Sequence, residues 1–418
     1  MKLRVHFHPP QLPQEGTLGQ ARLYWLEAAS PLARLWVVWE APALPTYPPF
    51  VRKILLKLLS EENQRYGPGG ISQRLHRLGW EFEWSATKDH FFLSAEGLAE
   101  NFAAAVRYLG EALEGLIGFG PRVDIHLRQA AAEQARALAN PAYRADAHLD
   151  RLLWEGSYAT TALLSPTDIL HTPHESIRAY YRDFLLRGLR HIIVAAPYLP
   201  KALLAWAQWA KPLTYGLKVA PLHPPRTYAE AAPQAKQTSL RLAYVWVPPS
   251  HPHYGYYQLA LMRLGGYFGA QLMRRIREEA GLTYGIYAKP QITRVRSCFI
   301  ITAEVARPRA EEAYQKIHEE VGQWQQNPFP EPETLEEVRN YLLTQLMPEG
   351  PGEWGQRLSR WVAAGATPQA YLAYGYQVER ALTSTWPSLE LPTTPIAQVE
   401  VGQGICLRPS EPCPHVSA

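Results

Sequence analysis

The chain has 418 residues and a formal net charge of +4, and 47% of its residues are hydrophobic, with 13 Trp and 23 Tyr. This length predicts at least two domains, and the apolar content predicts a large core and excludes a disordered chain. The basic residues are scattered, so nothing indicates a nucleic-acid partner, and no apolar stretch approaches the about 20 residues that span a bilayer, so we expect a cytoplasmic protein without membrane partners.

The first half of the chain predicts strands and helices in alternation. Residues 34–42, RLWVVWEAP, indicate a buried strand that ends at a proline. Residues 75–98 read as the end of a helix, a glycine stop, a strand, a turn and a second strand, and residues 99–116 predict another helix. A helix is also predicted over residues 50–63, and its apolar positions follow helical spacing: Val51, Ile54, Leu55, Leu58 and Leu59.

The second half repeats this order of elements. Residues 241–249, RLAYVWVPP, match the first strand, and residues 274–305 again read as helix, glycine stop, strand, turn and strand. The repetition predicts an α+β protein of two tandem homologous domains, each with an antiparallel-rich sheet covered by helices. We place these domains at residues 1–210 and 240–418, joined by a linker rich in Pro and Ala at residues 211–239.

One stretch resembles a known signature. Residues 264–285, LGGYFGAQLMRRIREEAGLTYG, resemble the C-terminal-domain signature of the pitrilysin and mitochondrial-processing-peptidase family of zinc peptidases. Where the family usually has Ser-Arg before the helix, this chain has Ala270-Gln271. The resemblance implies a metallohydrolase-like fold of the processing-peptidase type. The matching residues are Leu264, Gly265, Gly266, Leu272, Arg277, Glu278, Gly281, Leu282 and Tyr284.

The zinc motif of the active family members, H-x-x-E-H, is absent from the sequence. The helix that should carry it aligns so that Lys53 and Lys57 take the two histidine positions and Leu56 takes the position of the general base. Lysine has no lone pair for zinc at neutral pH, and leucine cannot accept a proton. Glu133 has the spacing of the third ligand, but a lone helical glutamate is more often a solvated surface charge. We therefore expect that this chain binds no metal.

Two residues of the signature carry the expected function. Read without the family, Arg277 is a solvated arginine near a helix C-terminus, and Tyr284 is a core tyrosine on the strand face of Leu282 and Ile286. The resemblance instead implies that Arg277 and Tyr284 reach a peptide held at zinc. A guanidinium and a phenol are suited to bind a peptide carbonyl and to stabilise the oxyanion that develops there.

These residues predict the non-metal-binding subunit of a heterodimeric zinc metalloendopeptidase that is inactive alone. Zinc is expected in the partner, a homologous subunit that carries H-x-x-E-H, and the substrate is expected to be a peptide or unfolded polypeptide. The alternative is a catalytically inactive scaffold or peptide-binding protein of the same fold. A hydrolase with a different site has no support in the sequence, which contains no G-x-S-x-G motif.

Overall fold

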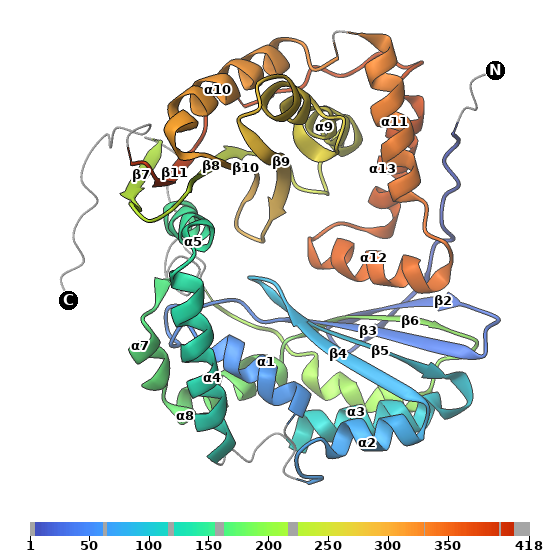
Figure 1. Ribbon diagram of the computed structural model, residues 1–418. Helices are drawn as coiled ribbons and strands as arrows, with labels where there is room; N and C mark the ends of the chain where they lie inside the picture. Colours follow the sequence, from blue (N-terminus) through green and yellow to red (C-terminus); the bar gives the residue numbers. More distant parts are fainter. Residues whose placement is uncertain are drawn as a thin grey trace.

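Two β-sheets and their covering helices make up the protein (Figure 1). The computed structural model describes residues 5–61, 65–115, 121–154, 163–215, 225–329, 331–392 and 394–404. No helix in these ranges is long and apolar enough to cross a membrane. The α+β class with two antiparallel-rich sheets, predicted from the repeated order of elements, is confirmed.

The first sheet has six strands in the order β1-β2-β6-β3-β5-β4. Strands β2 and β6 pair in parallel, and the other neighbours are antiparallel. Alternating side chains of a strand point to opposite faces, and the long β3 is buried on both because helices cover both. The strands are β1 Gln14–Leu18, β2 Ala21–Glu27, β3 Leu32–Glu40, β4 Trp80–Ala86, β5 His90–Leu98 and β6 Leu189–Ala196.

The second sheet has five strands in the order β7-β11-β8-β10-β9, so β9 is an edge strand. Strands β7 and β11 pair in parallel, and the remaining pairs are antiparallel. The strands are β7 Arg226–Ala231, β8 Gln237–Val245, β9 Thr283–Ile292, β10 Ser297–Ala306 and β11 Ala397–Gly402. Strand β7 and the start of β8 thus lie inside the range that the sequence suggests as a linker. The proposed boundaries at residues 210 and 240 remain a prediction.

Helices complete both halves, and several of them begin at a proline, which is pre-organised for the first helical turn. The π-helical segment Met262–Gly266 contains Gly265 and Gly266 of the signature, and the segment Met273–Glu279 ends shortly before Gly281. The α-helices are α1 Val51–Glu61, α2 Gly70–Arg77, α3 Phe102–Glu114, α4 Pro121–Leu138, α5 Pro141–Leu153, α7 Pro166–Leu170, α8 His174–Tyr180, α9 Tyr254–Leu261, α10 Ala310–Gln326, α11 Pro332–Leu346, α12 Pro351–Ala363 and α13 Pro368–Arg380.

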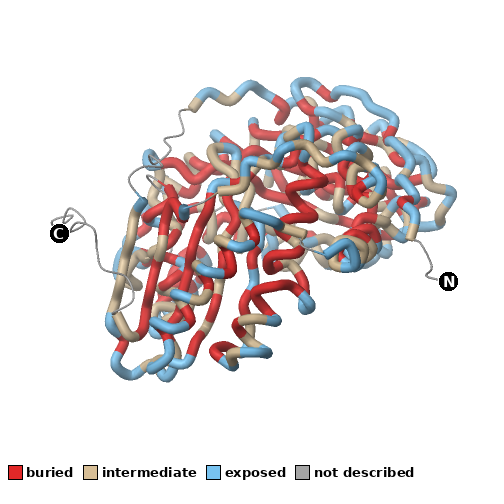
Figure 2. Tube along the Cα trace, turned by 90° about the horizontal axis from the view of Figure 1, so that it is seen from above, coloured by how far each residue is buried: buried red, intermediate tan, exposed pale blue. Residues whose placement is uncertain are grey.

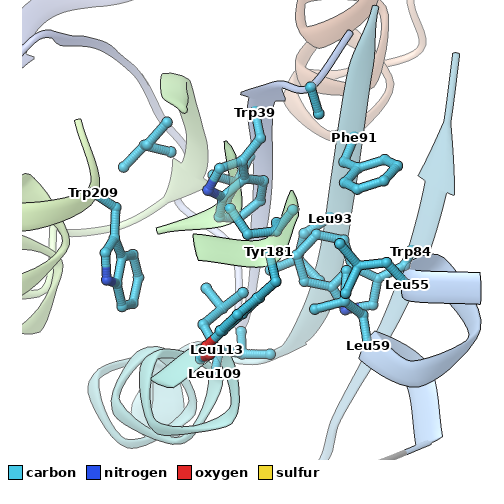
Figure 3. Packing of buried hydrophobic residues seen from close by; sticks show 14 of the residues in the cluster. Trp39, Leu55, Leu59, Trp84, Phe91, Leu93, Leu109, Leu113, Tyr181 and Trp209 are labelled. Atoms are coloured by element: carbon cyan, nitrogen blue, oxygen red, sulfur yellow. Dashed lines mark hydrogen bonds between the residues drawn. The ribbon is translucent and has the colours of Figure 1, made fainter. Parts of the chain in front are cut away.

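The core of the first half lies between its sheet and helix α1. Trp39 and Trp84 come from strands β3 and β4, and their ring centroids lie 5.1 Å apart (Figure 3). Phe91 of β5 and the leucines Leu55 and Leu59 of α1 belong to the same buried cluster. The apolar face predicted for residues 50–63 is therefore the face that α1 turns to the sheet.

Each half of the chain contributes a helix that packs on the sheet of the other half. Helix α12 of the second half packs on β3 and β6 of the first sheet, on the face opposite α1, α2 and α3 (Figure 1). Helix α5 of the first half packs on β8 and β11 of the second sheet. Figure 2 shows that buried segments run through both halves. This exchange fixes the first sheet relative to the second, because each half supplies part of the other's core.

Candidate functional site

Helices α1 and α4 bring together the three residues that the resemblance aligns with metal ligands. Lys53 and Lys57 are four residues apart and share one face of α1. The Lys57 Nζ lies 2.7 Å from Glu133 Oε1, and the Lys53 Nζ lies 3.4 Å from Glu133 Oε2. Glu133 is thus held by two lysines and is not a lone charge, although its side chain is 41% exposed and remains partly solvated, as expected.

The chemistry of this cluster excludes a metal ligand set. Lysine ammonium groups donate hydrogen bonds only, and they occupy both oxygens of the Glu133 carboxylate. The hydrogen bond from Lys57 is the main cause that lowers the pKa of Glu133 below its usual value. Two ammonium groups and one carboxylate give the same net charge as Zn²⁺ with two neutral imidazoles and one carboxylate. The ion cluster replaces the charge of a metal but not its Lewis acidity.

The described residues contain no other group that could take a metal. Among them, no three His, Cys, Asp or Glu side chains are close enough together to hold an ion.

Arg277 lies near the end of the segment Met273–Glu279, where the chain turns into β9. Its guanidinium stands over the ring of Phe268, 4.8 Å from the ring centroid. The neighbouring Arg275 pairs with Glu279, whereas Arg277 has no carboxylate within salt-bridge distance in the described part of the chain. The charge of Arg277 is therefore not used in an internal ion pair.

Gly281 makes the corner between this helix and the strand, as the sequence predicts. Its φ of 62° lies in the left-handed region, which favours glycine. The Gly281 N–H donates to the carbonyl of Arg277 at 3.1 Å, and the Leu282 N–H donates to that of Ile276 at 2.9 Å. The corner closes the helix and starts β9 within two residues.

Tyr284 lies on the edge strand β9 and is 88% exposed. The reading of Tyr284 as a core residue is wrong, although Leu282 and Ile286 are both buried as expected. The pairing of β9 with β10 shifts between Ile286 and Thr283, which is a β-bulge. The bulge interrupts the alternation of faces, so Thr283 points inward, where its hydroxyl donates to the Glu304 carbonyl at 2.6 Å.

The two signature residues thus flank one corner at the edge of the second sheet. Among the described strands, β9 pairs with β10 on one side only, so its other edge is open, although the Gly285 and Ile286 N–H groups donate to Thr283 Oγ1 and Met273 Sδ. Three cavities among the described residues, with volumes of about 770, 580 and 470 Å³, are lined by residues other than Arg277 and Tyr284. Arg277 and Tyr284 therefore present an uncommitted cation and an exposed phenol on an open strand edge.

Comparison with protein families matches one family model. The model described as the peptidase M16 inactive domain matches residues 174–342, a range that includes Arg277 and Tyr284. No curated protein matches the chain significantly.

Solved structures share the fold over nearly the whole chain. A peptidase M16 inactive domain from Pseudomonas fluorescens superposes with a TM-score of 0.80 at 19% identity, covering 96% of this chain and 100% of the other. A protease from Helicobacter pylori gives 0.72 at 12% identity, with 94% and 100% covered. The periplasmic protease PqqL from Escherichia coli gives 0.71 at 12% identity, with 96% of this chain and 47% of PqqL covered. At such identities the likeness shows the fold alone.

Proposed function

We propose that this chain, whose residues 174–342 match the family model of the inactive M16 peptidase domain, is the non-metal subunit of a two-chain zinc endopeptidase. This match agrees with the resemblance to the pitrilysin type that the signature indicates. A chain with Lys53, Leu56 and Lys57 at the motif positions lacks a metal site and a general base, so it would be inactive alone. A homologous partner with H-x-x-E-H would supply both.

The observation that carries this proposal is the state of Arg277 and Tyr284. Arg277 has no internal counter-charge among the described residues, and Tyr284 is 88% exposed. Burying two such groups against a substrate would complete hydrogen bonds that the chain itself leaves open. The guanidinium would hold the carbonyl of the scissile peptide, and the phenol O–H would donate to the oxygen that gains negative charge. The partner's zinc would polarise the same carbonyl.

The edge strand suggests how the substrate would lie. An extended peptide could add to β9 by main-chain hydrogen bonds, because this strand has a neighbour on one side only. Such pairing depends little on side chains, so it would accept unfolded polypeptides of varied sequence. Main-chain pairing would hold the peptide beside Tyr284, which lies on that strand.

The test mixes the purified chain with a homologue that carries H-x-x-E-H and measures peptide hydrolysis. Activity is expected in the mixture and not in this chain alone. In the mixture, Arg277→Ala and Tyr284→Phe should each lower kcat/KM by about 10²–10³-fold, the usual cost of losing one preorganised donor. Arg275→Ala and Tyr376→Phe are the matched controls and should leave kcat/KM unchanged. Arg275 already pairs with Glu279, and Tyr376 lies on α13 and not on the edge strand β9. Equal rates for all four variants would refute the role.

The second candidate is a scaffold or peptide-binding protein that has lost the chemistry. The ion cluster of Lys53, Lys57 and Glu133 favours it, because the cluster ties α1 to α4 without providing catalysis. Such a protein would bind peptides, and mixing with the partner would produce no hydrolysis that depends on Arg277. A cytoplasmic location is also part of our proposal. PqqL is periplasmic, so cell fractionation is the measurement that decides this point.

A further inference from the structure

A cavity of about 580 Å³ lies where the two halves meet. The turn between β4 and β5 supplies one wall, and the turn between β9 and β10, helix α12 and the start of α9 supply the others. Its apolar lining includes the rings of Phe92, Tyr254, Trp361 and Tyr371. A cavity of this volume with aromatic walls fits a small ligand or one large side chain.

Two buried polar side chains in this lining have no internal partner. His90 is 8% exposed and Tyr254 is 7% exposed. Within the described ranges, neither the His90 imidazole nor the Tyr254 hydroxyl has a hydrogen-bond partner. Burial lowers the pKa of His90 to about 3, so the ring is neutral at pH 7 and offers one donor and one acceptor. Neither group is among the described side-chain atoms that are sealed from solvent without a partner, so both polar tips open into the cavity, where they can hydrogen-bond a bound group.

Arg360 adds a positive charge to the same cavity. Its guanidinium stands over the ring of Phe92, 3.8 Å from the centroid, and its Nη2 donates to Ser85 Oγ at 3.0 Å. No carboxylate of the described residues lies within salt-bridge distance of Arg360. Stacking on an aromatic ring holds the planar guanidinium in place and leaves other N–H groups free for an anion.

The remaining charged groups of the cavity are already paired. Asp89 accepts a hydrogen bond from the Arg294 N–H at 3.0 Å, and the Arg294 guanidinium pairs with Glu40. Arg357 pairs with Glu353. Arg294 shares Glu40 with Arg190. Arg360 is the arginine of this lining that has no carboxylate within salt-bridge distance in the described ranges, with Glu83 acting on it from farther away.

We propose that this cavity binds a carboxylate carried on an apolar group, of the size of a phenylalanine residue. Arg360 would take the carboxylate, the rings of Phe92 and Trp361 would enclose the apolar group, and His90 and Tyr254 would hydrogen-bond its polar atoms. A free small carboxylate and the C-terminal residue of a peptide share this chemistry. Because both halves line the cavity, the ligand would also join them. The proposal does not depend on the role of Arg277 and Tyr284.

The experiment uses calorimetric titration of the full chain with matched pairs of probes. N-acetyl-L-phenylalanine is compared with its amide, and a heptapeptide that ends in a free phenylalanine is compared with the C-terminally amidated peptide. The acids should bind at least about tenfold more tightly than the amides, because only the acids balance the charge of Arg360. Binding of the small acid alone identifies a free carboxylate as the ligand, and binding of the peptide acid identifies a peptide end. Equal affinities of acid and amide would overturn the proposal.

Variants separate the site from the rest of the surface. Arg360→Gln should weaken the acids about 10- to 100-fold and leave the amides unchanged. Arg380→Gln is the control, because Arg380 also stands over a ring, that of Tyr376, at 5.7 Å, but lies outside the cavity. Ala364→Phe would fill the cavity without removing a charge, and it should abolish binding of every probe. Unchanged binding in Ala364→Phe, or an equal loss in Arg380→Gln, would contradict the proposed site.

Discussion

Replacing Lys53 and Lys57 with histidine should convert their ion cluster with Glu133 into a zinc site. The ammonium groups of Lys57 and Lys53 lie 2.7 and 3.4 Å from the same carboxylate, and their i, i+4 spacing places both side chains on the face of α1 that meets α4. Histidines four residues apart on a helix and one glutamate provide the two nitrogens and one oxygen that a catalytic-type zinc site uses, with a fourth position open to water. Only the side-chain chemistry at residues 53 and 57 is missing.

The size of the expected stability change depends on how exposed the side chains of Lys53, Lys57 and Glu133 are. The three side chains are between 26% and 41% exposed, so the variant without zinc loses two ion pairs worth at most about 1 kcal/mol each. Zinc at 100 times its dissociation constant would then add ~2.7 kcal/mol of stability. For a cooperative unit of ~200 residues this corresponds to a rise in Tm of roughly 5–10 °C.

The assay is thermal unfolding of the double variant with and without zinc, together with the metal content after dialysis. A third change, Glu133→Gln, should remove most of this zinc stabilisation, because the oxygen ligand would be neutral. The wild-type chain should gain none from zinc at residues 53, 57 and 133. Zinc binding that is undiminished by Glu133→Gln, or absent from the double variant, would refute the reasoning about this geometry.

Two further perturbations test the fold and the cluster. Gly355→Ala should lower the Tm, at a cost of about 1–3 kcal/mol, because its Cβ would clash with the ring of Trp36. Gly322→Ala, in open space on α10, should be neutral or stabilising. Glu133→Gln should destabilise the chain at pH 7 by at most about 1 kcal/mol. Lys57 lowers the folded-state pKa of the Glu133 carboxyl, so the destabilisation by Glu133→Gln should become smaller as the pH falls through that pKa. Urea unfolding of both proteins at pH 7 and pH 3 measures this, and an equal destabilisation at the two pH values would contradict the expected coupling to the pKa.

Local sequence determined the elements and the resemblance to the peptidase signature. The repeated order of strand, helix, glycine stop and paired strands follows from apolar periodicity and from glycine at helix ends, and the structure contains both copies. The corner at Gly281 was readable for the same reason, because a helix that ends at glycine and continues as a strand is a property of neighbouring residues. The i, i+4 spacing of Lys53 and Lys57 likewise placed them on one helix face.

Only the tertiary structure decided which distant groups meet and which face the solvent. Glu133 lies on another helix, and the packing of α4 against α1, not its spacing in the sequence, brings its carboxylate to the lysines. Tyr284 is exposed because a bulge in the pairing of β9 with β10 interrupts the two-residue alternation that sequence reasoning assumes. Helices α5 and α12 each pack on the sheet of the other half, and the cavity between the halves depends on this packing. These contacts join segments far apart in the chain, so the periodicity within any one segment does not encode them.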